Sequence, residues 1–302
     1  MSKFLKYIAC AGLLTFGLSL ASCSDDEGVT PSDVTDIRYE AGPGKITLHW
    51  NTPDDGTVKY VKVTYYDHLT KQNEVRLASI YADSILIPAT RKKYGTYSFT
   101  IQSISTSGDG GTITPFEAVS GPAPITTLYG APTKLTLTAS DLSTNAQENT
   151  EGPISNLVDG ILGNTDATKN NFFHTSWSST VSGVHYLQVN LPQTFTTDDA
   201  FRFFYAPRYN GANKPTDFDL MGSIDGDNWF LIKNFTKDAD GLPVSSTATF
   251  TSLDIDVPQP FDKIRINVNA TNSGTPYWTM SEFEFYYVKK TVIDPELPDV
   301  DI

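Results

Sequence analysis

The 302-residue sequence has little cysteine, little positive charge and no long helical pattern. It holds two cysteines, and its 22 lysines and arginines face 35 aspartates and glutamates, for a net charge of −13. A surface this acidic repels nucleic acid and anionic lipid, so we expect neither as a partner. After residue 23 no amphipathic helical pattern lasts more than two turns, so helix should be a minor component.

Residues 1–22 have the pattern of an export signal. Lys3 and Lys6 precede an apolar run from Tyr7 to Leu20, which is too short to span a bilayer but suits a signal-peptide core. The segment Leu20-Ala21-Ser22-Cys23 then resembles the lipobox of bacterial lipoproteins. That resemblance implies cleavage before Cys23 and diacylation of its thiol. The alternative is an ordinary signal peptide followed by a chance cysteine.

The cysteine count agrees with a lipid anchor. Cys10 lies inside the apolar run and would leave with it, so Cys23 would be the only cysteine left and no internal disulfide could form. Residues 23–33 read as a tether, and Ser24-Asp25-Asp26-Glu27 resembles the acidic export signal of Bacteroidetes surface lipoproteins. We therefore expect a lipid-anchored protein of the outer membrane, exposed on the cell surface.

The remaining composition predicts an all-β protein with two sandwiches. Aromatic residues make up 12% of the chain, and short runs of Thr, Val, Tyr and Phe are broken by Gly, Pro, Asn and Asp. In the region 34–127, alternation predicts strands, with turn signals every 8–12 residues or so as in a sandwich. These strands are Lys45–Trp50, Tyr60–Tyr66, Ser84–Ile87 and Tyr97–Ser105.

The region 34–127 resembles a fibronectin type III domain of the immunoglobulin-like class. The resemblance rests on the order Ile46-x-Leu48-x-Trp50, then Tyr60-x-x-Val63-x-Tyr65, then Tyr97-x-Phe99-x-Ile101. It implies that Tyr97 is the tyrosine corner, whose hydroxyl closes the loop before its own strand. No cluster of histidines or carboxylates is visible in the region, so we expect it to act as a spacer.

The region 130–290 resembles the F5/8 type C (discoidin) domain, the galactose-binding-like jelly roll of the family 32 carbohydrate-binding modules. The resemblance rests on sequence blocks in the family's order. They are Asn156-Leu157-Val158-Asp159-Gly160, Ser176-Trp177, Tyr186-Leu187-Gln188-Val189-Asn190-Leu191, Pro207-Arg208, Ser223-Ile224-Asp225-Gly226-Asp227-Asn228-Trp229, Lys263-Ile264-Arg265-Ile266, and Ser281-Glu282-Phe283-Glu284-Phe285. The positions Trp177, Trp229 and Phe285 read most simply as core, and Arg265 should point away from the core.

The resemblance implies a structural calcium ion. Calcium takes several oxygen ligands, often carbonyls with one or two carboxylates. Carried over from the family, Asp159 and Glu282 supply the carboxylates and Asn156 a carbonyl. A threonine ligand is also expected, and our candidate is Thr175. Because the loop is lengthened, Thr165, Thr168 and Asn171 remain alternatives to Thr175 as the ligand. The alternative to a calcium site is a polar loop without a metal, whose side chains bond to its own backbone.

The resemblance also implies a glycan site on loops at one end of the sandwich. One loop holds Arg208, Tyr209 and Asn210, and the other holds Tyr277 and Trp278 just before the last strand. His174 is expected near the first loop. The alternative is structural, with Arg208 paired to an acid and Trp278 capping the core.

These features predict a non-catalytic glycan-binding lipoprotein that captures a poly- or oligosaccharide, with an outer-membrane uptake complex as its expected partner. The sequence contains no Gly-x-Ser-x-Gly and no His-Glu-x-x-His motif. The alternative function is a protein-binding adhesion module or a structural subunit of such a complex. Residues 291–302 are acidic with two prolines, and they predict a flexible tail.

Overall fold

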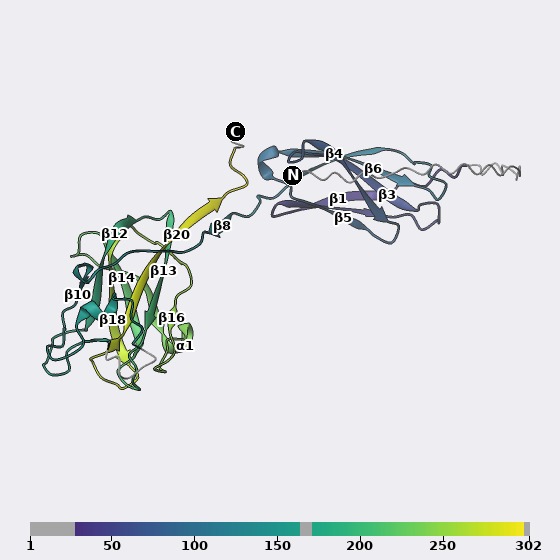
Figure 1. The fold of residues 1–302 in the computed structure, drawn as a ribbon. Coiled ribbons are helices and arrows are strands. Elements are labelled where there is room, and N and C mark those ends of the chain that lie inside the picture. The colour runs from purple at the N-terminus through teal and green to yellow at the C-terminus, as the bar shows by residue number, and fades with distance from the viewer. Residues whose placement is uncertain (1–27, 164–170, 299–302) are drawn as a thin grey trace, which may run out of the picture. The chain divides into compact units, whose positions relative to one another are not determined.

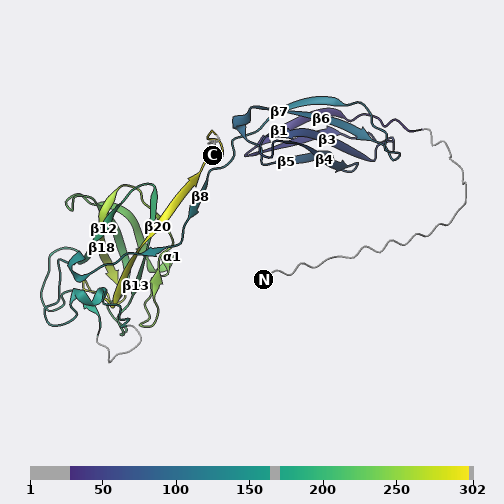
Figure 2. The same ribbon diagram turned by 45° about the horizontal axis from the view of Figure 1, so that its top comes forward.

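The computed structural model describes residues 28–163 and 171–298, which form two compact units (Figures 1 and 2). Unit 1 comprises the chain up to Pro124 together with Asp294–Ile302, and unit 2 is Ile125–Ile293. The expected signal segment and Cys23 lie outside the described residues. Within the described ranges, no helix has the length and apolar character needed to cross a membrane.

Unit 1 is a sandwich of two antiparallel sheets. The first sheet has the order β1 (Thr35–Gly42), β2 (Lys45–Asn51) and β5 (Ser84–Pro88). The second has the order β4 (Gln72–Ser79), β3 (Tyr60–Asp67), β6 (Thr96–Ile104) and β7 (Thr114–Val119). A short 3-10 helix, η1 (Lys92–Tyr94), precedes β6. The four predicted strands are thus all present.

The core of unit 1 is built from the alternating residues of its strands. Trp50, Ile46 and Leu48 are fully buried, as their alternation predicts. The hydroxyl of Tyr97 accepts a hydrogen bond from the Arg91 backbone N–H (2.8 Å) and donates to the Arg91 carbonyl (3.3 Å). The predicted tyrosine corner is therefore present.

The C-terminal segment differs from the expected flexible tail. Residues 291–293 extend the last strand of unit 2, and the residues that follow return to unit 1. The carboxylate of Glu296 accepts hydrogen bonds from the backbone N–H groups of Lys92, Lys93 and Ala123, at 3.2, 2.7 and 2.6 Å. The acidic composition that suggested disorder supplies the acceptor that holds the segment in place.

Unit 2 is a second sandwich. One sheet has the order β10 (Leu142–Ser143), β12 (Tyr186–Phe195), β18 (Phe261–Thr271), β14 (Pro215–Ser223) and β15 (Phe230–Thr236). The other has the order β16 (Phe250–Thr251), β13 (Asp199–Ala206), β20 (Glu282–Ile293) and β8 (Thr126–Tyr129). Shorter elements are β9 (Thr133–Lys134), β11 (Phe173–His174), β17 (Ile255–Asp256), β19 (Thr279–Met280), the 3-10 helices η2 (Ala139–Asp141) and η3 (Ile154–Leu157), and α1 (Lys237–Asp240).

An aromatic core joins the two sheets of unit 2. Phe201 and Phe285 stack at 5.0 Å between ring centroids, and Phe195 packs edge-on against Phe285 at 5.6 Å. Phe285 is thus a core residue, as predicted.

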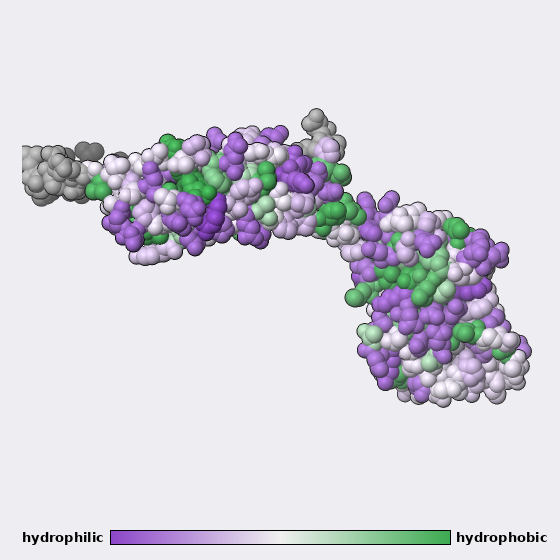
Figure 3. Space-filling view, turned by 180° about the vertical axis from the view of Figure 1, so that it is seen from behind, coloured by the Kyte–Doolittle hydropathy of each residue, from purple (hydrophilic) through white to green (hydrophobic). Residues whose placement is uncertain are grey.

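Hydrophobic residues on the surface form separate patches among hydrophilic ones on the face shown in Figure 3.

Two predicted local features of the five-stranded sheet are confirmed. The Asp-Gly segment forms the hairpin turn between β14 and β15, where Asp225 accepts hydrogen bonds from the backbone of Asp227 and Asn228. Arg265 points away from the core, and its guanidinium lies between the rings of Tyr186 (4.2 Å) and Trp229 (4.1 Å).

Candidate functional site

One end of unit 2 gathers most of its chemically distinctive side chains. Because β18 runs antiparallel to both β12 and β14, the residues before those two strands meet the residues after β18. In the other sheet, Ala206 at the end of β13 pairs with Glu282 at the start of β20. We call this region, formed by the loops around residues 146–163, 171–185, 207–214 and 272–281, the loop end.

Trp177 is the most exposed aromatic ring of the loop end. Half of its surface is accessible, and its indole Nε1 donates a hydrogen bond to Glu151 Oε1 at 3.1 Å. The other oxygen of Glu151 lies 3.7 Å from Arg208. The guanidinium of Arg208 in turn covers the ring of Phe172 at 3.4 Å. An exposed indole and a guanidinium are thus held side by side through one carboxylate.

Tyr277 and Trp177 line a cavity of about 250 Å³ at the loop end. The ring of Tyr277 lies 5.8 Å from that of His174. His185 also lines the cavity, and its buried Nδ1 has no hydrogen-bond partner among the described residues. Burial lowers the pKa of His185, so the neutral imidazole is favoured. The cavity therefore combines aromatic faces with a buried polar atom that lacks a partner.

The loop from Arg208 to Asn213 is firmly braced. Its Asn213 adopts a left-handed backbone conformation (φ 60°), and the Asn213 carbonyl accepts a hydrogen bond from Thr279 N at 2.8 Å. The side chain of Asn272 donates to the Gly211 carbonyl at 2.8 Å. Lys214 is fully buried and donates from Nζ to the Asn210 carbonyl. These bonds fix the loop before any ligand arrives.

For two residues the predicted glycan-binding role is wrong. Trp278 is fully buried, packs edge-on against Phe173 (5.2 Å) and donates from Nε1 to the His185 carbonyl at 3.2 Å. His174 is 3% exposed, and its Nδ1 lies 2.6 Å from the Thr175 carbonyl. Both belong to the core of the loop end, since no sugar could reach either ring.

The other expected glycan residues do lie near the surface. Tyr209 is 39% exposed, while Arg208, Asn210 and Tyr277 are half-buried. Trp177, which the sequence suggested as core, is the residue that replaces Trp278 as the exposed indole. Its setting in Ser176-Trp177-Ser178-Ser179, with no alternating apolar neighbours, was the available signal.

Glu148 is a further residue that sequence reasoning missed. Its buried carboxylate accepts hydrogen bonds from the backbone and hydroxyl of Thr150, from the backbone of Trp177, and from the backbone and hydroxyl of Ser178. Although burial raises it, hydrogen bonds from Thr150 and Ser178 bring the pKa of Glu148 down to about 2. A permanent carboxylate thus fixes the backbone of the Trp177 loop.

The carboxylates of the expected calcium site do come together. Glu282 is 2% exposed, and its Oε2 has no hydrogen-bond partner among the described residues. Burial and the charge of Asp159 raise the pKa of Glu282 to about 7. Both residues line a cavity of about 470 Å³. A buried, unpartnered carboxylate oxygen beside a second carboxylate fits a hard cation.

The other candidate calcium ligands differ in how well they fit the site. Thr175 does not fit, because its fully buried hydroxyl accepts from Trp278 N (2.8 Å) and lies 3.3 Å from the Trp278 carbonyl. Asn171 donates from Nδ2 to Asp159 Oδ1 at 3.0 Å, which keeps it beside the carboxylates. Asn156 donates its amide to the Phe172 carbonyl at 3.0 Å. Thr165 and Thr168 lie outside the described residues.

Calcium at this position would need carbonyl ligands. Within residues 28–163 and 171–298, no three or more His, Cys, Asp or Glu side chains are grouped to hold a metal. Asp159 and Glu282 can therefore contribute two carboxylates, and main-chain oxygens of the same loop would have to complete the coordination.

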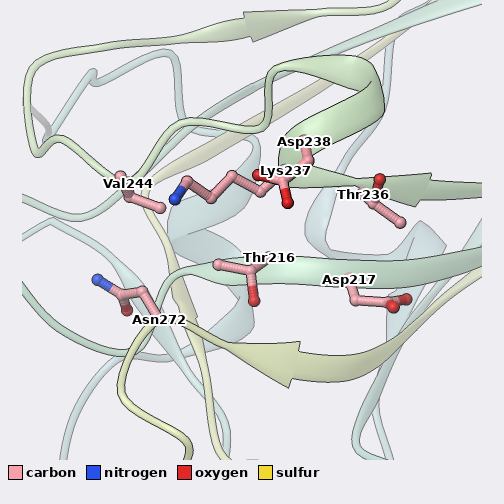
Figure 4. A pocket seen from close by; sticks show the side chains of 7 residues that line it. All are labelled: Thr216, Asp217, Thr236, Lys237, Asp238, Val244 and Asn272. Carbon is pink, nitrogen blue, oxygen red and sulfur yellow. The ribbon is translucent and has the colours of Figure 1, made fainter.

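A larger cavity of about 690 Å³ opens beside β14 and α1 (Figure 4). Its lining is polar except for Val244, and Lys237 extends across it. Asn272 lines it too and so joins it to the Arg208 loop. No aromatic ring lines this cavity, so it lacks the flat apolar face on which a sugar could stack.

Comparison with known proteins identifies the second unit. Residues 136–283 match the F5/8 type C domain family, so this part of the chain is an F5/8 type C domain. No curated protein sequence matches the chain.

Several solved structures are similar to the chain. A family 32 carbohydrate-binding module from Clostridium perfringens, in complex with galactose, is 19% identical, with a TM-score of 0.38 over 52% of this chain and 99% of its own. The C-terminal domain of a chitobiase from Bacteroides fragilis is 18% identical, with a TM-score of 0.38 over 53% and 99%. A SusE-like protein is 15% identical, with a TM-score of 0.38 over 85% and 97%.

Proposed function

We propose that the chain is a non-catalytic glycan-binding protein and that the loop end of unit 2 binds the sugar. The observation that carries this proposal is the half-exposed indole of Trp177, held by Glu151 beside the guanidinium of Arg208. Binding sites combine apolar and aromatic faces with a few fixed polar groups, and this surface has both.

The chemistry of a pyranose matches this arrangement. One face of the ring presents C–H groups that pack on an aromatic ring, and its hydroxyls take hydrogen bonds from planar donors. Trp177 and Tyr277 supply the aromatic faces, and Arg208 supplies the donors. Because Glu148 and Lys214 fix the loops in advance, binding would order few side chains.

We also propose that calcium binds at Asp159 and Glu282 in a structural role. Calcium would neutralise the two carboxylates and hold the loop of residues 156–163 against the start of β20. The support is the buried, unpartnered Oε2 of Glu282.

The cellular setting proposed here rests on the sequence alone. Acylation at Cys23 would anchor the protein to the outer membrane and expose it at the cell surface, where it would capture a poly- or oligosaccharide for an uptake complex. Labelling of the expressed chain with a fatty-acid analogue tests the anchor, with Cys23→Ser as the control. Equal labelling of both chains would refute it.

A glycan array with the full chain tests the binding function. We expect binding to at least one glycan class, its loss in Trp177→Ala, and its retention in Tyr81→Ala, which removes a 96% exposed aromatic ring from unit 1. A silent array together with a stable protein complex in pull-down would refute glycan binding in favour of protein binding.

A further inference from the structure

Lys214 is a buried cation directly behind the Arg208 loop. Its side chain is fully buried, and Nζ donates to the main-chain carbonyl and, at 3.1 Å, to the side-chain oxygen of Asn210. Among the described residues no carboxylate pairs with it. A buried ammonium without a counter-ion is unfavourable, so the fold tolerates an unbalanced positive charge here.

A second cation lies next to the first. Burial and the nearby charge of Arg208 lower the pKa of Lys214 to about 8, so Lys214 remains mostly protonated at neutral pH. Glu151 is the single described carboxylate that pairs with Arg208, and at 3.7 Å the contact is long. Glu151 also accepts the indole N–H of Trp177. Arg208 therefore has one partly committed carboxylate partner, and Lys214 has none among the described residues.

The donors of Arg208 remain available to a ligand. One face of its guanidinium is covered by Phe172, and among the described residues its N–H groups donate no hydrogen bond. The other buried carboxylate nearby, Glu148, already accepts five hydrogen bonds from its own loops. A planar guanidinium with free edges binds carboxylate or sulfate oxygens in pairs.

We propose that the loop end selects an acidic glycan, whose carboxylate or sulfate group lies against Arg208 with Lys214 behind it. This inference rests on the proposed glycan-binding function and adds the substrate class. The net charge of the whole chain, −13, opposes an anionic ligand at long range. The preference must therefore come from this local pair of cations rather than from the overall field.

Titration calorimetry on the full chain can separate the two claims. The ligands are a neutral galacto-oligosaccharide, an oligogalacturonide of the same length, and a sulfated galacto-oligosaccharide. We expect at least one acidic ligand to bind about tenfold more tightly than the neutral one, as a charge-assisted bidentate contact allows. The two acidic arms distinguish a carboxylate ligand from a sulfate ligand.

Lys214→Met is the decisive variant, because it keeps an unbranched side chain of similar size and removes the charge. We expect it to reduce the ratio of acidic to neutral affinity several-fold, with the neutral affinity of the same variant as the reference, because Lys214 also braces the Arg208 loop. Lys237→Met, which removes an exposed positive charge elsewhere, is the matched control and should keep the preference. If Lys214→Met is unfolded by calorimetry, Arg208→Gln takes its place.

Equal affinity for neutral and acidic ligands would overturn this inference and leave glycan binding intact. A preference that survives both Lys214→Met and Arg208→Gln would overturn it too. Failure of all three ligands and of a wider glycan array would instead refute the proposed function itself.

Discussion

The two sandwiches bury different kinds of polar side chain. The buried polar residues described in unit 1 carry only hydroxyl groups, on Thr90, Ser103, Ser105 and Ser120. Unit 2 also buries side chains that can carry charge, namely Glu148, His174, His185, Lys214 and Glu282. A buried hydroxyl needs one partner, whereas a buried charge must be paired or densely hydrogen-bonded.

Under the proposed function, this difference distinguishes unit 2, which would hold the binding site, from unit 1, which would support it. These five ionisable groups lie at or beside the loop end, where burial shifts the pKa or hydrogen bonds offset that shift. Such clusters gather at functional sites because a protein retains a costly group where it is used. Among its described residues, unit 1 buries no Lys, Arg, His, Asp or Glu side chain.

The largest effects are expected from alanine substitutions of two tryptophans of unit 2, one buried and one exposed. Trp278→Ala should lower the free energy of unfolding by about 3–5 kcal/mol, because it empties a buried site. Trp177→Ala should change it by less than about 0.5 kcal/mol and abolish glycan binding. Calorimetry and glycan titration measure both. A stable Trp278→Ala, or a Trp177→Ala that still binds, would contradict the assignment.

Calcium should stabilise unit 2 alone. At a hundredfold excess over its dissociation constant, a single site adds about 2.7 kcal/mol to the stability of the folded state. We expect calcium to raise the melting temperature of the unit 2 transition, and Asp159→Asn to remove that rise. Magnesium is the control ion. An equal rise in the unit 1 transition, or no rise in the parent chain, would argue against the site.

Glu148 should make the stability of unit 2 depend on pH in the acidic range. Its pKa in the folded protein is about 2, below the usual 4.5, so its contribution is present above pH 4.5 and is lost as the pH falls toward 2. Glu148→Gln should therefore lower the melting temperature at pH 7 and have a smaller effect near pH 2. Glu117→Gln, on an exposed strand residue of unit 1, serves as the control. A constant difference across that range would show that the charge has no role.

The smallest effect is expected from the tyrosine corner of unit 1. Tyr97→Phe removes the two hydrogen bonds to Arg91 and should cost about 1 kcal/mol. Only the first unfolding transition should shift, while glycan affinity stays the same. A change in glycan affinity would show that unit 1 is more than a spacer.

Much of the fold could be predicted because alternation reports which face of a strand is buried. The strands around Trp50, Val63 and Phe203 follow this rule. Strand β4 does not, because Val75 and Leu77 alternate with polar residues on it and yet are 54% and 61% exposed. Edge strands that face solvent are the part of the fold that periodicity cannot find.

The candidate site was harder to predict because it depends on loop packing. The family resemblance paired Asp159 with Glu282, and the two residues do line one cavity. The Arg208 loop stays a predicted glycan site. Sequence order could not tell which tryptophan faces solvent, because Trp278 is buried through its contacts with Phe173 and His185, which are 105 and 93 residues away in the chain. Local sequence does not record such contacts.

The position of Glu296 has a consequence for biosynthesis. The ribosome makes residues 1–124 first, but the acceptor for the backbone N–H groups of Lys92, Lys93 and Ala123 is added only after all of unit 2 has been made. During translation these N–H groups would thus have water as their acceptor until Glu296 is made. A premature stop within the last strand would remove this contact from the first domain, although the mutated codon lies far from that domain along the chain.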